Sequence, residues 1–236
     1  MPPSVPPPSA ELPRLPGRWD PARELSSLPW DSVPLLAWLA RTEDGGLPVQ
    51  ATAVRLGWDP GALWARFDCD DSHPWATLAA RDAPLWQEET VELFLAAGVG
   101  DPETYVEIEV NPLGALFDAL VENPGLERAA LATDTAFDWP GIRWAAGRRS
   151  GGWWAALALP WAGLPPEAGG PLSGPPAALR ANLYRIDRPP GTPAEHSAWS
   201  PTLVAPADFH RPRRFGRLAV SGAGSGPPPG PDLAGR

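Results

Sequence analysis

Alternation of apolar and polar side chains, repeated in short runs, limits this chain to β-structure more than any other feature. From Tyr105 to Asn111 every second residue is Val or Ile, as expected of a strand with one face in a core. Similar runs occupy 49–56, 63–69, 90–96, 115–121, 142–147, 153–159, 179–186 and 215–220, with Gly, Pro and Asn turn signals between them. About nine or ten short strands predict an all-β fold, an antiparallel β-sandwich or barrel.

Helical periodicity is scarce, and only two segments, 32–41 and 127–133, are predicted to form short helices. The 34 prolines of the chain are dense at both ends. We therefore expect disordered Pro-rich ends at 1–11 and 222–236, and one ordered domain from 12 to 221.

Composition excludes several classes of protein. The net charge of −9 argues against a nucleic-acid partner, because phosphate binding requires a basic surface. Cys69 is the single cysteine, so no intramolecular disulfide can form, and its place in an alternating run predicts a buried thiol. No apolar run is long enough to cross a membrane, and no signal peptide is evident, so a cytoplasmic location is expected.

Tryptophan is abundant, with 13 residues, and its broad apolar face suits contact with a sugar ring. Most of these side chains are expected in the core, because large aromatic residues are usually buried. Trp86 differs because it precedes a strand, where a loop meets the sheet, and it is the favoured candidate for ligand binding. Trp75 and Trp199 also lie in loops and are weaker candidates.

Polar and aromatic residues form rows on the predicted outer faces of the strands. Carboxylate, amide and guanidinium groups in such rows would form hydrogen bonds with vicinal hydroxyls, although a solvated sheet face is the simpler interpretation for any one residue. The four rows are Trp64, Arg66 and Asp68; Glu92 and Phe94; Tyr105, Glu107, Glu109 and Asn111; and Arg180, Asn182 and Tyr184.

Three other functions have weaker support. Glu107 and Glu109 are two residues apart on one strand, about 7 Å, a separation compatible with an inverting glycosidase, but both would project from the same side of a ligand. A metal site has little to favour it, since the three histidines lack ligand spacing and the acidic run at Asp68–Asp71 lacks an EF-hand pattern. Haem ligation would depend on loop histidines, since Met1 is the sole Met and Lys is absent.

Seven segments taken in order resemble the family 9 carbohydrate-binding modules, within the DOMON-like group of β-sandwiches. They are WDPGALWARFDCDD, LWQEETVELFL, YVEIEVNPLGALFD, WWAALALPW, LRANLYRID, AWSPT and FHRPRRFGRLAV. The resemblance covers roughly residues 28–221. It implies a jelly-roll-like sandwich that binds sugar without catalysis, and calcium in some members, with ligands that do not map onto this chain.

The resemblance also implies roles for individual residues. Trp86 matches one of two rings that clamp a terminal sugar, Glu92 a glutamate on the following strand, and Asn111 an amide. Phe209 takes the place of the second ring, and Glu109 replaces an expected arginine. We therefore expect a non-catalytic saccharide-binding module with no required cofactor. Its predicted carbohydrate-binding residues are Trp86, Glu92, Glu109, Asn111, Asn182, Tyr184, Trp199, Phe209 and His210.

Overall fold

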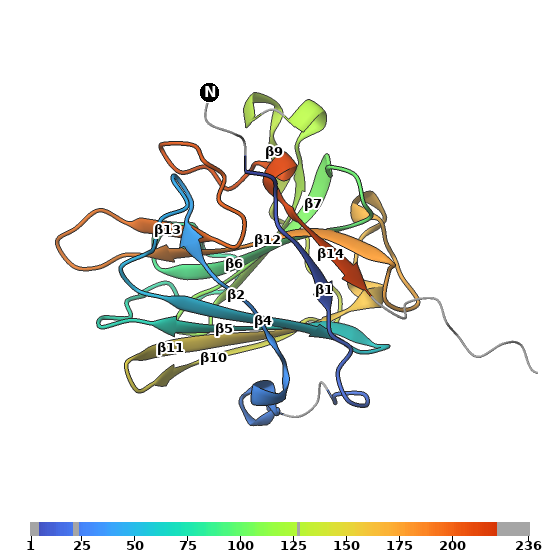
Figure 1. The fold of residues 1–236 in the computed structure, drawn as a ribbon, viewed down its shortest axis with the longest axis horizontal. Helices are drawn as coiled ribbons and strands as arrows, with labels where there is room; N and C mark the ends of the chain where they lie inside the picture. The colour runs from blue at the N-terminus through green and yellow to red at the C-terminus, as the bar shows by residue number, and fades with distance from the viewer. Residues whose placement is uncertain (1–4, 21–23, 127, 221–236) are drawn as a thin grey trace, which may run out of the picture.

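The protein consists of two mainly antiparallel β-sheets stacked face to face (Figure 1). The structure is a computed structural model, which describes residues 5–20, 24–126 and 128–220. Sheet A has the order β1-β14-β12-β6-β7-β8-β9, and β13 joins β12 to β3. Sheet B has the order β10-β11-β5-β4-β2. The sheet A strands are β1 (Ser9–Leu12), β3 (Ala40–Arg41), β6 (Thr90–Ala97), β7 (Thr104–Val110), β8 (Leu116–Glu122), β9 (Ala132–Asp134), β12 (Ala178–Asp187), β13 (Glu195–Ala198) and β14 (Gly216–Val220). Those of sheet B are β2 (Leu35–Trp38), β4 (Thr52–Trp58), β5 (Ala62–Asp70), β10 (Arg143–Arg149) and β11 (Gly152–Pro160).

The main core lies between the two sheets. Alternate residues of β6 and β7, such as Leu93 and Ile108, pack with Phe67 of β5 and Leu157 of β11 in one apolar cluster. Cys69 belongs to this cluster, as predicted, and burial raises the pKa of its thiol to about 12. The period-two pattern is thus explained by burial of one face of each strand.

The all-β sandwich predicted from the sequence is confirmed, and each predicted strand corresponds to an observed one. Both predicted helices are wrong. Residues 32–41 contain β2 and β3, and the 127–133 segment contains a 3₁₀ turn (Arg128–Ala130) and the start of β9. Helical structure among the described residues is limited to short 3₁₀ turns. The first strand begins at Ser9, before the expected boundary at 12, while 1–4 and 221–236 lie outside the described residues.

The N-terminal segment packs on the outer face of sheet B and forms a second apolar cluster there. The ring of Trp19 makes edge contacts with Trp30 at 5.2 Å and with Trp64 at 5.4 Å. Asp59 accepts hydrogen bonds from the Trp19 backbone N–H at 2.8 Å and from Trp64 Nε1 at 3.1 Å. The row of Trp64, Arg66 and Asp68 therefore lies on a different sheet from the other polar rows, and cannot form one surface with them.

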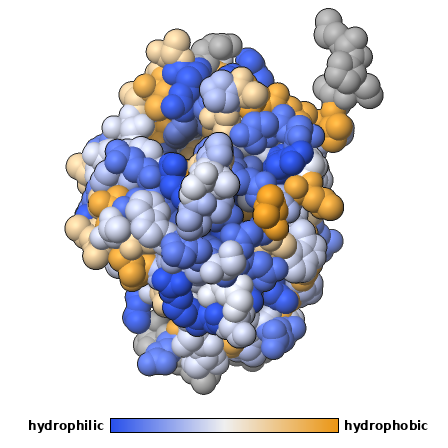
Figure 2. Space-filling view, turned by 90° about the vertical axis from the view of Figure 1, so that its left-hand side faces the viewer, coloured by the Kyte–Doolittle hydropathy of each residue, from blue (hydrophilic) through white to orange (hydrophobic). Residues whose placement is uncertain are grey.

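None of the described helical segments is long and apolar enough to span a membrane. In the view of Figure 2, hydrophobic residues on the surface form small groups separated by hydrophilic ones.

Candidate functional site

The outer face of sheet A is covered by loops, and this corrects the expectation that its polar rows face solvent. Glu92, Glu107, Glu109, Asn182 and Tyr184 are all buried. The loop that precedes β14 lies over this face, where Phe209 stacks on Tyr184 with ring centroids 4.1 Å apart. Loops from three parts of the chain thus roof the face and leave one pocket open between them.

Asn111 and Asn182 form hydrogen bonds within the protein, mainly to backbone groups. Asn111 donates to Leu78 O at 2.7 Å and accepts from the N–H groups of Leu113 and Ala115, both at 3.0 Å, which closes the β7–β8 turn. Asn182 donates to Ser200 O at 2.8 Å and accepts from Ser200 N at 2.9 Å. Their polar groups hold loops on the sheet.

Two further predicted site residues have structural contacts. The Tyr184 hydroxyl donates to Phe209 O at 2.9 Å. The ring of Trp199 is buried directly beside Gly216, where an added Cβ would meet the ring at 2.3 Å. Neither Tyr184 nor Trp199 lines the pocket.

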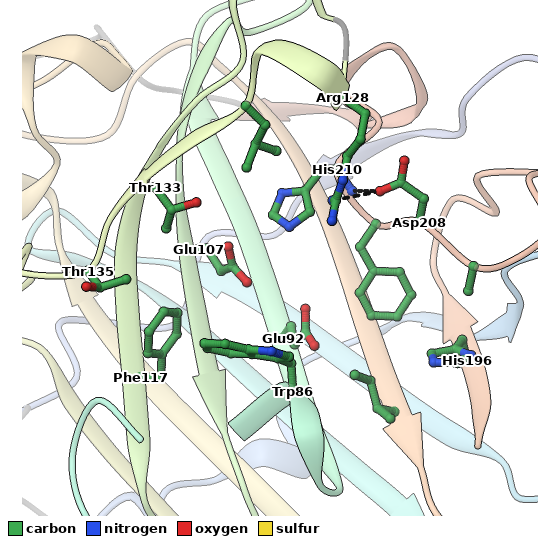
Figure 3. Close-up of a pocket in the computed structure, with 14 residues that line it drawn as sticks. Trp86, Glu92, Glu107, Phe117, Arg128, Thr133, Thr135, His196, Asp208 and His210 are labelled. Carbon is green, nitrogen blue, oxygen red and sulfur yellow. Dashed lines mark hydrogen bonds and ion pairs between the residues drawn. The ribbon is translucent and has the colours of Figure 1, made fainter. Parts of the chain in front are cut away.

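The pocket on the sheet A face has a volume of about 470 Å³, which suits a small ligand. Four of the predicted residues line it: Trp86, Glu92, Phe209 and His210. Glu107, considered above as a catalytic residue, also lines it. Figure 3 shows Glu92 and Glu107 pointing into the pocket from β6 and β7, with Trp86 beside Glu92 and His210 beyond Glu107.

Trp86 lies in the 3₁₀ turn Leu85–Gln87 at the mouth of the pocket, and 41% of it is exposed. Its ring packs edge-on against Phe117 of β8, with centroids 5.1 Å apart. Arg188 Nη2 donates to the Trp86 carbonyl at 3.0 Å, which fixes the turn. The indole is therefore held in place on one side and open to a ligand on the other.

Three buried carboxylates form a cluster at the pocket, in which Glu92 and Glu107 line the floor and Glu109 is their neighbour outside the lining. Glu92 and Glu109 are direct cross-strand neighbours, and Glu107 follows on the same face of β7. One carboxylate oxygen of each lies within 4.8 Å of the others. Burial raises the pKa of Glu107 to about 7. Burial, with repulsion from neighbouring carboxylates, raises the pKa of Glu92 and of Glu109 well above the usual value.

The rim of the pocket carries an ion pair and a neutral histidine. Arg128 Nη1 lies 2.9 Å from Asp208 Oδ1, so the arginine is already paired. Burial, reinforced by Arg128, lowers the pKa of His210 to about 4. His210 Nδ1 lies 2.8 Å from the Tyr105 hydroxyl. The floor therefore holds the titratable acidic groups of the pocket, and their raised pKa values mean that they keep protons near neutral pH.

Sequence reasoning missed most of the pocket wall. Phe117 could have been found from register, because it lies opposite Glu109 on β8. Ile186 lies near the end of β12, a strand that the alternation predicts, and the others come from irregular loops and short strands that it does not reveal. The missed lining residues are Phe117, Arg128, Leu131, Thr133, Thr135, Ile186, His196, Ala207 and Asp208.

Solved structures share this fold at low sequence identity. A candidate carbohydrate-binding protein from Bacteroides uniformis is 15% identical with a TM-score of 0.71, covering 90% of this chain and 99% of that one. A family 9 carbohydrate-binding module from Caldicellulosiruptor kristjanssonii in complex with glucose is 13% identical, with a TM-score of 0.60 and coverage of 92% and 98%. A module of the same family and organism with cellotriose is 12% identical, with a TM-score of 0.56 and coverage of 90% and 93%.

These likenesses confirm the predicted fold, that of the family 9 carbohydrate-binding modules. No protein-family model matches the sequence. One curated protein, named "Extracellular protein", from Arthroderma benhamiae, is 28% identical over 111 residues, which are 46% of this chain and 49% of the relative. The match thus spans about half the length of that protein. Its name contradicts the cytoplasmic location expected from the sequence.

Proposed function

We propose that this protein is a non-catalytic module that binds a saccharide in the sheet A pocket. The observation that carries the proposal is a half-exposed indole, Trp86, placed beside buried carboxylates in a cavity of about 470 Å³. An indole face removes the C–H face of a sugar ring from water, and carboxylates accept hydrogen bonds from its hydroxyls. The shared fold with glucose- and cellotriose-bound modules supports the same function.

The pocket offers two kinds of contact to a sugar. Trp86 supplies a flat apolar wall at the mouth, and Phe209 a second aromatic surface across the pocket. Glu92 and Glu107 provide acceptors at the floor. Phe209 is stacked on Tyr184 and mostly buried, so Trp86 is expected to contribute most of the aromatic contact.

Calorimetric titration with a panel of neutral mono- and oligosaccharides tests the proposal. We expect binding by at least one sugar, and a loss of about tenfold or more in Trp86→Ala, since an aromatic contact contributes about 1 kcal/mol beyond its buried area. The matched control is Trp38→Ala, which removes a 59%-exposed indole from sheet B and should leave affinity unchanged. Absence of heat with every sugar, or equal affinity in Trp86→Ala, would contradict the proposal.

The geometry does not favour a glycosidase. Glu92, Glu107 and Glu109 lie together on one floor, with oxygens within 4.8 Å. A hydrolase needs one carboxyl group on each side of the scissile bond. All three residues would meet a ligand from the same side, so we expect no turnover of chromogenic glycosides.

A further inference from the structure

The three carboxylates on the pocket floor lack the partners that buried charges normally have. Both carboxylate oxygens of Glu109, and Oε1 of Glu92, are buried and have no hydrogen-bond partner among the described residues. An unpaired buried carboxylate carries a large desolvation cost. One carboxylate oxygen of each residue lies within 4.8 Å of the others, so the desolvation cost of the three groups falls on one small region.

A second acidic group in the chain has an arginine at its centre. Asp71, Glu89 and Asp187 surround Arg185, whose Nη2 lies 2.8 Å from Asp71, 3.0 Å from Glu89 and 3.3 Å from Asp187. The guanidinium occupies the place where a cation would otherwise be required.

A third acidic group has the same arrangement nearer the surface. Asp82, Asp118 and Asp138 share Arg81, which lies 2.6 Å from Asp118 and 3.5 Å from Asp82, and also pairs with Asp138. Among the described residues these are the three groups with metal-like spacing, and the Glu92–Glu107–Glu109 group is the one for which no ion pair is found.

The position of the unpaired group leaves it open to a small cation. Glu92 and Glu107 line the pocket, so an ion can enter from its mouth. The neighbouring cation, Arg128, is exposed at the rim and paired to Asp208 at 2.9 Å. The protein chain thus supplies carboxyl oxygens that can release their protons when a cation binds, and within the described residues it provides no matching positive charge of its own.

We propose that Glu92, Glu107 and Glu109 form a site for a hard divalent cation of the calcium, magnesium or manganese type. Such ions take carboxylate oxygens as ligands and keep other positions for water or hydroxyl groups. The open side of the site faces the pocket, where water or the hydroxyls of a bound sugar can complete the coordination shell. The inference concerns the pocket of the proposed function, but binding of the ion alone does not require a sugar.

Titration of chelator-treated protein with CaCl₂, MgCl₂ and MnCl₂ at pH 7.5 tests the site, by calorimetry and by thermal shift. We expect one ion per chain and a higher Tm with at least one of these salts. Glu109→Gln, which is nearly isosteric, should weaken binding by tenfold or more, and Glu92→Gln should do the same. Asp82→Asn, in the group held by Arg81, is the matched control and should bind as the unaltered protein does.

The outcomes separate this inference from the proposed function. No heat and no Tm shift with any of the three ions at millimolar concentration would overturn it, as would undiminished binding in both Gln variants. Paramagnetic resonance of Mn²⁺ with the unaltered protein measures ion binding directly and needs no variant. Sugar binding by a protein that takes up none of the three ions would contradict the cation site alone, and ion binding without any sugar affinity would contradict the saccharide proposal alone.

Discussion

At the scale of single residues, two groups of buried acidic side chains differ in whether an arginine is paired with them. Arg185 is buried and shared by three acidic side chains, so each of these carboxyl groups has a cationic partner. Glu109 is equally buried, lies opposite Glu92 on the neighbouring strand, and has no such partner among the described residues. Natural cores seldom keep unpaired carboxylates, and this supports the proposal of a cation site at Glu109.

Glu109 should make stability depend on pH in metal-free buffer. A pKa raised in the folded state means that the folded protein holds more protons than the unfolded chain, so the free energy of unfolding falls as pH rises. The pKa of Glu107 is raised to about 7, and those of Glu92 and Glu109 are also raised. We expect these three groups to lower Tm as the pH rises from about 5, near the unfolded pKa of Glu, through about 7, the folded pKa of Glu107.

Glu109→Gln removes one carboxylate and its repulsion on the other two, so its Tm should fall less over that range. Asp82→Asn should retain the slope of the unaltered protein. His196 and His210, whose pKa values are lowered by burial, act in the opposite direction below about pH 7, because the unfolded histidines bind protons there. The unaltered protein and both variants keep these histidines, so the difference in slope still reports the carboxylates. A slope in Glu109→Gln equal to that of the unaltered protein would contradict the argument.

At the scale of elements, the alternation located the long strands but not what covers them. The sequence predicts a strand at 105–111, and β7 is Thr104–Val110. The polar face of that strand was expected to face solvent. Alternation shows that the two faces of a strand differ in polarity, but it does not show what covers either face. Loops such as the one that contains Phe209 cover the polar face. Their positions depend on tertiary contacts such as the stacking of Phe209 on Tyr184.

The short strands escaped prediction for local reasons. The leucines of 35–39 have a spacing that a helix would also give, and β2 has a bulge between Leu35 and Ala37 that breaks its alternation. β1 lies in a proline-rich stretch typical of disorder, but its four residues pair in parallel with β14. Within the candidate site, Trp86 and Glu92 could be predicted because they lie in one short segment. Arg128 and Asp208 could not, because they come from loops that are distant in the sequence and meet only in the fold.

β1 should contribute to stability despite its length, because Leu12 is fully buried in the main core. Leu12→Ala is expected to lower the free energy of unfolding by about 2–5 kcal/mol, the usual range for a buried leucine. Leu47→Ala, at a loop position that is 88% exposed, is the matched control and should change it by less than about 0.5 kcal/mol. Urea denaturation followed by tryptophan fluorescence measures both, and equal stabilities would show that β1 does not dock in solution.

At the scale of the whole molecule, one core joins both sheets. The main cluster includes Phe67 from sheet B and Leu93 from sheet A, so the inner face of each sheet is buried by the other. The N-terminal segment adds its own cluster on the outer side of sheet B, through Trp19 and Trp64. Both sheets should therefore lose their packing together.

Thermal unfolding is therefore expected to be a single cooperative transition, because the two sheets share one core. Near-ultraviolet and far-ultraviolet circular dichroism should give the same midpoint within error. Two separated transitions would show that the sheets, or the N-terminal segment, unfold independently.

The parallel pairing of β1 with β14 sets the boundary of sheet A. Ser9 is paired with Arg217 and Leu12 with Val220, and prolines at positions 8 and 13 flank the short outer strand. Proline offers no amide hydrogen, so this border is a poor template for a further strand. Removing β1 would uncover the longer border of β14, and truncated chains would then be prone to join one another edge to edge.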